Sequence, residues 1–359
     1  MADMTIPKRH KAAVYSQPGT TVIEIVEVDT PEPEEGEVLV RLSHSGVCHS
    51  DYSFIMNAWE HMPESTPRGQ IGGHEGVGTV VKVGRGVKAR KVGDRVGVKW
   101  ITSTCLTCDM CLVGDEGRCP FKKVSGYRNP GTFQQYVCSD AAYVTPIPDG
   151  LDSALAAPLL CGGVTVYNAL LKGNLKPGDW VALSGAGGGL GHLAIQYAKS
   201  MGFQVIGIDH GSKKEFCLGI GANVFLDFTQ YTDAQLFEEV KRVTNGGCHA
   251  VLVLNGSTKS YDQGLDMLRY GGTLVCVGVP EKAMPLQRAQ PHFLITNQLS
   301  IRGTVVGNRR DAVECMKPAA RGEVKTKISI EPLSKLSQVF DDMGSGRLQG
   351  RAVIDVWKL

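Results

Sequence analysis

The sequence has no long apolar run. No stretch approaches the roughly 20 consecutive apolar residues that cross a bilayer as a helix, which argues against a membrane-spanning protein. The first ten residues, Met1–His10, contain no apolar segment like that of a secretory signal. With Asp3 and few basic residues they also make a poor transit peptide. We therefore expect a cytoplasmic protein without a membrane partner.

An excess of charge of either sign is also missing. The 359 residues include 38 Lys and Arg against 36 Asp and Glu, so charge gives no reason to expect a nucleic acid or an anionic membrane as partner. Internal repeats and low-complexity segments are absent from the sequence. Hydrophobic residues make up 42%, which is enough to form a core, and the length suits two domains better than one.

Cysteine, by contrast, is plentiful, with eleven residues. In a chain without a secretory signal, we expect free thiols or metal ligands rather than disulfides. Four thiolates close in sequence can complete the closed tetrahedral shell of a structural zinc. An iron–sulfur cluster also accepts four cysteines, but the last gap here is longer than in the ferredoxin pattern. We predict structural zinc at the C-x2-C-x2-C-x7-C motif of Cys105, Cys108, Cys111 and Cys119.

The lobe that carries this motif, residues 104–121, has few residues that could form a core. Metal binding would therefore supply its folding energy.

Isolated potential metal ligands occur elsewhere. His74 and Glu75 lie in the segment Gly73–Gly78, whose glycines let the backbone pass close to a metal. Cys48 follows a predicted strand, and Cys161 lies at a predicted helix boundary. Each has an ordinary alternative, a buried thiol for either cysteine and a polar turn for His74 and Glu75. Their occurrence together in one chain favours a second metal site.

The first part of the chain is rich in short strand patterns. Segments rich in Val and Ile alternate with Gly and Pro turn signals, which favours a small, partly closed β-barrel. Residues 350–355 are also strand-like, and we expect them to return to this domain. The predicted strands cover Lys11–Tyr15, Val22–Val28, Glu37–Ser43, Gly78–Val83 and Arg95–Val98.

The pattern changes after two predicted helices, at 151–160 and 164–172. Six short apolar strands follow, most of them separated by helical stretches, which predicts a doubly wound parallel sheet that binds a dinucleotide. The strands cover Trp180–Leu183, Gln204–Ile208, Asn223–Asp227, Ala250–Leu254, Thr273–Gly278 and Leu299–Gly303.

A glycine-rich loop, Ser184–Gly191, joins the first of these strands to a helix. It has no strict G-x-G-x-x-G ending at Gly191, because Ala186 occupies the place of the first glycine. The strand–loop–helix context still indicates a pyrophosphate site, in which Gly188 allows close approach and the helix N-terminus supplies N–H groups. The loop residues expected at the cofactor are Gly185, Gly188, Gly189, Leu190 and Gly191.

An acidic residue follows the second strand of this sheet. Asp209 lies roughly 20 residues beyond the loop, as in dinucleotide sites. It would accept hydrogen bonds from the ribose hydroxyls and repel a 2′-phosphate, which favours NAD over NADP. Lys213 or Lys214 would soften that preference, unless both are solvated surface residues. We also expect Val277 and Val279 at the cofactor site.

Together these motifs resemble the zinc-dependent medium-chain alcohol dehydrogenases, especially the tetrameric yeast and fungal type. The resemblance covers nearly the whole chain. It rests on Gly46–Asp51, Gly73–Gly78, the four cysteines, Gly131–Tyr136, Leu160–Tyr167, Ser184–Gly191, Gly307–Arg309 and Gly350–Arg351.

The resemblance implies a GroES-like catalytic domain, residues 1–152 and 304–359, and a Rossmann NAD-binding domain, residues 153–303. It implies two zinc ions per chain, one catalytic and one structural, and a homotetramer. The implied reaction is reversible hydride transfer between a small-molecule alcohol and NAD, which gives an aldehyde or ketone.

The resemblance also implies the catalytic ligands. Cys48, His74 and Cys161 match the zinc ligands, which leave a fourth position for the alcohol oxygen. Glu75 is similar to the family acid that binds the zinc when substrate is absent. Asp51 is similar to the carboxylate that orients the histidine.

Further roles follow from the same resemblance. Ser50 matches the hydroxyl that accepts the alcohol proton, although a turn hydroxyl is its ordinary alternative. His49 and Arg351 are similar to contacts of the cofactor pyrophosphate. Trp59 and Trp100 resemble the bulky residues that narrow the alcohol pocket, although Trp59 is nearly as well explained as aromatic core.

The proton path departs from the family pattern. In the yeast-type motif a histidine follows the catalytic cysteine by five positions and relays the proton to solvent. Here that position is Ser53. The last proton transfer would then fall to Ser53, His49 or water.

The segment 54–70 is slightly longer than in the yeast-type proteins. With Phe54, Met56 and Met62, we expect it to line or cover the mouth of the substrate site. Of the histidines without another expected role, we place His61 alone near that mouth. A substrate larger than ethanol follows from this interpretation. The alternatives are a zinc-independent enoyl or quinone reductase and a non-catalytic nicotinamide-binding protein of the same fold.

Overall fold

The computed structural model describes residues 5–60, 62, 64–283, 285–348 and 350–359, so His61 lies outside the described residues. The chain divides into two compact units. The first comprises Met1–Cys161, Asn308–Ala320 and Thr326–Leu359, and the second comprises Gly162–Gly307 and Arg321–Lys325.

The first unit is built on a seven-stranded sheet. Six of its strands follow the order β11-β6-β5-β3-β19-β18, and the seventh, β10, pairs with β3. Its long strand β3 (Glu37–Gly46) pairs antiparallel with β5 (Gly76–Val83), β10 and β19 (Arg351–Asp355). The strand predicted near the end of the chain therefore does return to this unit. A three-stranded sheet, β2-β1-β4, adds to the sheet framework. The partly closed barrel is confirmed.

The core of the first unit consists mainly of Val, Leu, Ile and Phe side chains, many of which alternate along the strands, as strands with one buried face require. Its other strands are β1 (Arg9–Tyr15), β2 (Ile23–Asp29), β4 (Gln70–Ile71), β6 (Arg95–Val98), β7 (Ile101–Ser103), β8 (Lys123–Ser125), β9 (Arg128–Asn129), β10 (Tyr136–Asp140), β11 (Thr145–Pro146) and β18 (Ile328–Pro332). Its helices are α1 (His49–Met56), α2 (Asp109–Leu112), η1 (Glu116–Arg118), α3 (Ser153–Ala156), η2 (Ala157–Leu160), α10 (Arg309–Ala320), η5 (Leu333–Lys335) and α11 (Leu336–Gly344).

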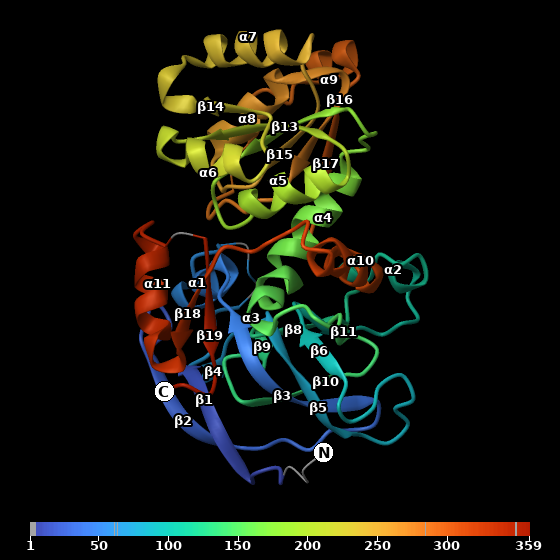
Figure 1. Cartoon of the computed structure of the whole chain (residues 1–359), viewed down its shortest axis with the longest axis vertical. Helices are drawn as coiled ribbons and strands as arrows, with labels where there is room; N and C mark the ends of the chain where they lie inside the picture. Colours follow the sequence, from blue (N-terminus) through green and yellow to red (C-terminus); the bar gives the residue numbers. More distant parts are fainter. Residues whose placement is uncertain (1–4, 61, 63, 284, 349) are drawn as a thin grey trace. The chain divides into compact units, whose positions relative to one another are not determined.

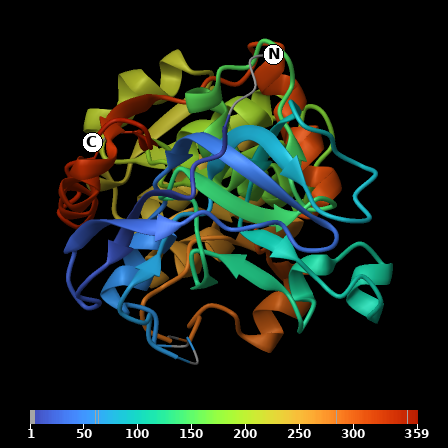
Figure 2. The same ribbon diagram turned by 90° about the horizontal axis from the view of Figure 1, so that it is seen from below.

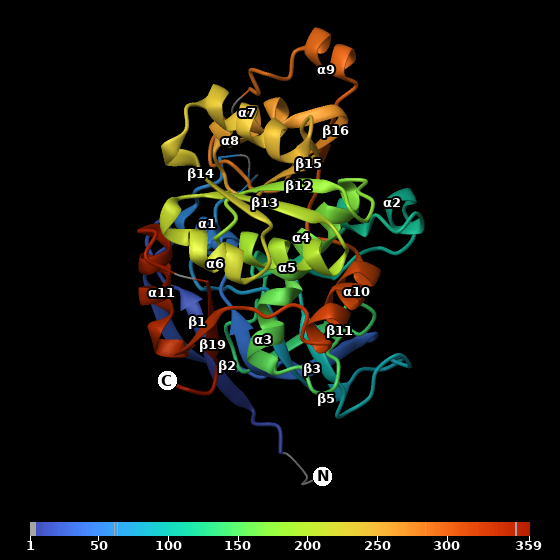
Figure 3. The ribbon, with the colours of Figure 1, turned by 45° about the horizontal axis from the view of Figure 1, so that its top comes forward.

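The second unit holds a six-stranded sheet in the order β14-β13-β12-β15-β16-β17, with every neighbouring pair parallel. Helices α5 and α6 cover one face of this sheet, and α7 and α8 cover the other (Figures 1 and 3). The strand order reverses between β12 and β15, the position where such sheets bind their ligands. The predicted doubly wound sheet is confirmed.

The elements of the second unit are α4 (Gly162–Lys172), β12 (Trp180–Ser184), α5 (Gly191–Ser200), β13 (Gln204–Asp209), η3 (Gly211–Lys213), α6 (Lys214–Gly219), β14 (Val224–Asp227), η4 (Phe228–Gln230), α7 (Asp233–Thr244), β15 (Cys248–Val253), α8 (Thr258–Asp266), β16 (Leu268–Cys276), α9 (Pro291–Asn297) and β17 (Ser300–Gly303).

The helix predicted at 151–160 is divided. Asp152 caps α3 by accepting hydrogen bonds from the backbone N–H groups of Ala154 and Leu155 at 2.9 and 3.1 Å. The chain then tightens into the 3-10 helix η2, which contains Pro158, a residue that has no N–H to continue the α-helical ladder. Among the described residues, no single helix has the length and apolar character to cross a membrane, although the bent pair Ser153–Leu160 and Gly162–Lys172 passes on those two criteria.

Candidate active site

Four side chains of metal-ligand type meet in the first unit. Cys48 lies immediately before α1, His74 and Glu75 lie between β4 and β5, and Cys161 follows η2. Their ligand atoms all lie within 4.8 Å of one another, and the two sulfur atoms are 3.9 Å apart. All four residues are buried. The structure thus brings together residues that the sequence places far apart.

His74 is held in one orientation by Asp51. The Nδ1 atom of His74 donates a hydrogen bond to Asp51 Oδ1 at 2.9 Å, and Asp51 Oδ2 accepts from the backbone N–H of Cys48 at 2.9 Å. The Nε2 atom of His74 is buried and has no hydrogen-bond partner among the described residues. A buried polar atom without a partner is costly, which marks Nε2 as the ligand atom.

Glu75 pairs with Arg351. Glu75 Oε1 forms a buried ion pair with the Arg351 guanidinium, whereas Glu75 Oε2 has no partner within the described chain. A Cβ atom at Gly46 would lie 2.0 Å from Glu75 Oε2, so glycine at this position makes room for the carboxylate. Sequence reasoning assigned Arg351 to the cofactor and missed this pair, because the two residues are 276 positions apart.

The electrostatics of the site follow from burial and close charges. Burial raises the pKa of Glu75 to about 7, although Arg351 opposes the change. Burial alone would lower the pKa of His74, but the Asp51 carboxylate and Cys48 raise it well above its usual value. The hydrogen bond from Cys161 lowers the pKa of Cys48 well below that of an ordinary thiol. Cys48 therefore has thiolate character, which metal binding requires.

The residues fit a zinc ion. Zinc in catalytic sites takes a mixed set of sulfur and nitrogen ligands, with one position left open. Two free thiols converge here with one imidazole nitrogen and one carboxylate oxygen that have no partner within the described part of the chain. The histidine also has the carboxylate partner that is typical of metal-bound imidazoles.

The hydroxyl groups predicted to move the proton lie on α1. Ser50 Oγ is 3.7 Å from the Cys48 sulfur. Ser53 Oγ lies 3.4 Å from His49 Nδ1. Ser53 is only 1% exposed, whereas His49 is an exposed residue. His49 is therefore much the more exposed of the two.

The two tryptophans predicted at the substrate pocket have different surroundings. Trp100 packs edge-on against the His74 ring, with the ring centroids 4.8 Å apart. Trp59 packs against Phe54 and lines a small pocket. Trp100 is therefore in direct contact with a metal-ligand residue.

The four-cysteine motif forms a second cluster. The sulfur atoms of Cys105, Cys108, Cys111 and Cys119 lie within 4.8 Å of one another in a lobe at the periphery of the first unit (Figure 2, teal). Leu112, Val113 and Phe121 are each at least 70% exposed, so this lobe has little core of its own. The closed set of four sulfurs fits a structural zinc.

The lobe is fastened to the rest of its unit by a buried carboxylate. Glu116, 3% exposed, accepts hydrogen bonds from the backbone N–H and the Nε of Arg309 at 2.8 and 3.1 Å. Asn308 adds a hydrogen bond to the carbonyl oxygen of Gly114 at 3.0 Å. These contacts fix the lobe at the start of α10.

The predicted cofactor loop lies in the second unit, between β12 and α5. Gly185 has a φ of +80°, and a Cβ atom at Gly191 would lie 2.2 Å from the carbonyl oxygen of Gly185. The loop therefore requires glycine at both positions. Gly188 and Gly189 complete the turn, and Leu190 immediately precedes α5.

Asp209 lies at the end of β13, beside this loop. Its Oδ2 accepts a hydrogen bond from the backbone N–H of Gly187 at 2.8 Å. Lys213 is half-buried, with side-chain carbons packed over Gly187, whereas Lys214 is exposed. Val277 and Val279 follow β16, whose carboxyl end lies at the same edge of the parallel sheet as that of β13.

Comparison with known proteins gives consistent matches. Residues 34–149 match the alcohol dehydrogenase GroES-like domain, and residues 189–321 match the zinc-binding dehydrogenase family. The chain is 51% identical to alcohol dehydrogenase 2 of Emericella nidulans, over 99% of this chain and 100% of the relative. It is 43% identical to an alcohol dehydrogenase of Schizosaccharomyces pombe over the same shares.

A solved structure also matches. The cinnamyl alcohol dehydrogenase of Sorghum bicolor superposes with a TM-score of 0.85 at 27% identity, over 97% of this chain and 98% of that one.

Proposed function

This chain belongs to the zinc-type medium-chain alcohol dehydrogenases, and from that membership we propose how its own residues share the reaction. The enzyme transfers hydride reversibly between an alcohol and NAD and uses zinc. Identity over the full length does not favour a zinc-independent reductase or a non-catalytic nicotinamide-binding protein. The observation that carries the residue assignment is the buried His74 Nε2, without a partner in the described chain and beside two free thiols.

Cys48, His74 and Cys161 hold the catalytic zinc in this proposal. When bound, the metal supplies Lewis acidity that lowers the pKa of the alcohol hydroxyl, so that hydride leaves carbon more readily. Asp51 holds the imidazole in the tautomer that presents Nε2. Glu75, paired with Arg351 through Oε1 and without a partner for Oε2 among the described residues, would be the carboxylate able to turn from the ion pair toward the metal.

Ser50 would relay the proton of the alcohol hydroxyl, accepting it as the serine gives up its own hydroxyl proton toward His49. Its position next to the Cys48 sulfur supports this role. Ser53 is buried and 3.4 Å from the exposed His49, so we assign the exit to solvent to His49 rather than to Ser53 alone.

The glycine loop and Asp209 bind the cofactor. The N-terminus of α5 offers N–H groups to the pyrophosphate, and Asp209 accepts from the ribose hydroxyls. Lys213 is half-buried and packs over the loop, so it is the lysine that would contact the cofactor. Lys214 is exposed and is the less favoured of the two. His49 and Arg351 remain candidates for the pyrophosphate contacts.

The substrate is an alcohol larger than ethanol with an apolar group. The aromatic side chains Trp100, Phe54 and Trp59 extend away from His74 and support this assignment. The Sorghum structure named as a cinnamyl alcohol dehydrogenase supports it as well.

We assign the assembly to a homotetramer in the cytoplasm. Strand β17 pairs with β16 and is the last strand of its sheet order, which leaves an edge available to a second copy. All eleven cysteines are free thiols, as in a reducing compartment.

A substrate panel tests the proposed function. Purified enzyme is assayed with ethanol, longer 1-alkanols and aryl alcohols, each with NAD and with NADP. We expect oxidation with NAD and a higher kcat/KM for alcohols longer than ethanol. An enzyme that binds NADH but oxidises none of these alcohols would contradict the proposal.

A further inference from the structure

A row of aromatic rings leads away from the catalytic cluster. The Trp100 ring meets His74 edge-on, and Phe54 stacks on Trp100 with centroids 5.5 Å apart and planes at 13°. Tyr127 stacks on Phe54 at 4.8 Å and 17°. Phe54 is 3% exposed. The Phe54 ring therefore fills the space between Trp100 and Tyr127.

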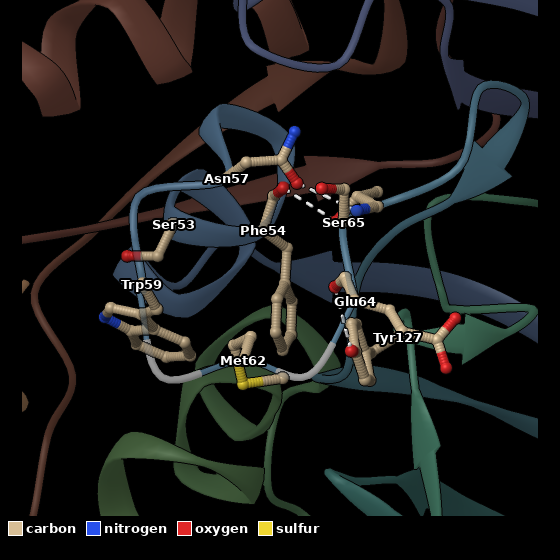
Figure 4. A pocket seen from close by; sticks show the side chains of 9 residues that line it. Ser53, Phe54, Asn57, Trp59, Met62, Glu64, Ser65 and Tyr127 are labelled. Atoms are coloured by element: carbon tan, nitrogen blue, oxygen red, sulfur yellow. Dashed lines mark hydrogen bonds between the residues drawn. The ribbon is translucent and has the colours of Figure 1, made fainter.

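A small pocket of about 50 Å³, partly open to solvent, lies at the far end of this row. In Figure 4 the Phe54 ring lies between Trp59 and Tyr127, with Met62 beside them. Trp100 is not part of the lining. Phe54 thus touches Trp100 and also forms a wall of the pocket. The lining residues are Ser53, Phe54, Asn57, Trp59, Met62, Glu64, Ser65, Thr66 and Tyr127.

The pocket walls are held by hydrogen bonds. Thr66 donates from its backbone N–H to Asn57 Oδ1 at 2.8 Å and from its hydroxyl to the carbonyl oxygen of Phe54 at 2.7 Å. The Tyr127 hydroxyl donates to the carbonyl oxygen of Glu64 at 3.1 Å. The Thr66 and Tyr127 hydroxyls are engaged with the backbone, and Phe54, Trp59 and Met62 give the pocket an apolar side opposite its polar lining residues. The pocket is therefore preformed, and a smaller side chain at Phe54 would enlarge it on its apolar side.

We propose that Phe54 determines the upper size limit of the alcohol by closing this preformed pocket off from the metal side. The occupant of the pocket, once the ring is made smaller, is the distal apolar part of a long-chain or aryl-substituted primary alcohol. This inference rests on the proposed alcohol dehydrogenase function and adds to it the residue that selects among alcohols. It also explains how a substrate can be larger than ethanol and still be limited in length.

The test compares Phe54→Leu and Phe54→Ala with wild type, each zinc-loaded and assayed with NAD. The measured quantity is kcat/KM for 1-octanol and for cinnamyl alcohol, each divided by kcat/KM for ethanol. Because a single methylene in an apolar pocket changes kcat/KM by about tenfold or more, we expect each ratio to rise at least about tenfold, mainly through a lower KM for the larger alcohol. The Leu variant retains an apolar side chain and keeps the test valid if the Ala variant does not fold.

The matched control is Phe340→Leu. Phe340 is also a buried phenylalanine of the same unit, but it packs against Tyr15, Tyr52 and Phe133 and does not line the pocket. Its ratios should equal those of wild type. A rise in this variant equal to that of Phe54→Leu would show a general loosening of the core and overturn the proposal.

A binding measurement separates occupancy from turnover. Trp100 stacks on Phe54 and Trp59 lines the pocket, so a chain that enters should change tryptophan fluorescence. We expect 1-octanol to give a saturable change at lower concentration in Phe54→Leu than in wild type. Folded, zinc-loaded variants with unchanged ratios and unchanged binding would overturn the role of Phe54 alone. A wild type that oxidises no alcohol would instead overturn the proposed function.

Discussion

Asp51 and His74 are joined by a hydrogen bond of 2.9 Å between Oδ1 and Nδ1, with both side chains fully buried. This bond fixes which ring nitrogen carries the proton. It leaves Nε2 of His74 to face the two thiols. The buried carboxylate is therefore a positioning group for the metal ligand and not a ligand itself.

Replacement of Asp51 should weaken the metal site without removing a ligand. In Asp51→Asn the amide is a poorer acceptor for Nδ1–H, so we expect zinc affinity to fall about 10–100-fold. Zinc retention during chelator titration measures the change. Asp94→Asn, a turn residue that accepts from the backbone N–H of Lys91, is the control. Equal retention in wild type and Asp51→Asn would refute the positioning role.

Asp209 should determine the choice of cofactor. A hydrogen bond to a charged group contributes about 1.5–3 kcal/mol, so Asp209→Asn should raise the KM for NAD about tenfold or more and lower the preference for NAD over NADP. Asn still offers an acceptor to the Gly187 N–H. Initial rates with both cofactors measure the preference. An unchanged ratio of the two kcat/KM values is the contrary result.

The same assay distinguishes the two lysines. Lys213 packs over Gly187, whereas Lys214 is exposed. We expect Lys213→Met to raise the KM for NAD more than Lys214→Met does. Equal increases in the KM for NAD would show that packing over the loop does not determine which lysine contacts the cofactor.

Lys99 makes the stability of the first unit depend on pH. Its ammonium is buried and donates to the carbonyl oxygens of Tyr143 and Ile101 at 2.8 and 3.3 Å. Burial lowers its pKa to about 7 from the ordinary 10.5, and the nearby Glu116 only partly opposes this. Between these two pKa values the unfolded chain binds more protons than the folded chain. Folding stability therefore rises with pH through this range.

Lys99→Met should remove that dependence. We expect the free energy of unfolding of wild type, minus that of Lys99→Met, to increase by about 1 kcal/mol from pH 6 to pH 8. Urea unfolding at both pH values measures it, with the exposed Lys88→Met as control. A difference that stays constant, or that falls with rising pH, would show that Lys99 is charged in the folded enzyme.

Local patterns made much of this molecule predictable. The four cysteines lie within fifteen residues of one another, so their spacing indicated a metal site. The Ser184–Gly191 loop was indicated by its position between a strand and a helix. The six parallel strands were found because strands buried on both faces are short apolar runs. Each of these features is determined by residues that are close together in the sequence.

The remainder depends on packing between distant segments. The Glu75–Arg351 pair joins residues 276 positions apart, and no local pattern signals it. The stacking of Phe54 on Trp100 and Tyr127 depends on how α1 packs against segments later in the chain. Hydrophobic pattern places such rings in a core but does not say which rings touch.

The most direct test of the central claim is the zinc content of Cys48→Ser, measured together with its alcohol oxidation. Cys138→Ser, a half-buried thiol outside both clusters, is the matched control. The account predicts that wild type and Cys138→Ser hold two zinc ions per chain and oxidise alcohols with NAD, and that Cys48→Ser retains the structural zinc, loses the other and loses activity. A Cys48→Ser enzyme with full zinc content and unchanged alcohol oxidation would contradict it.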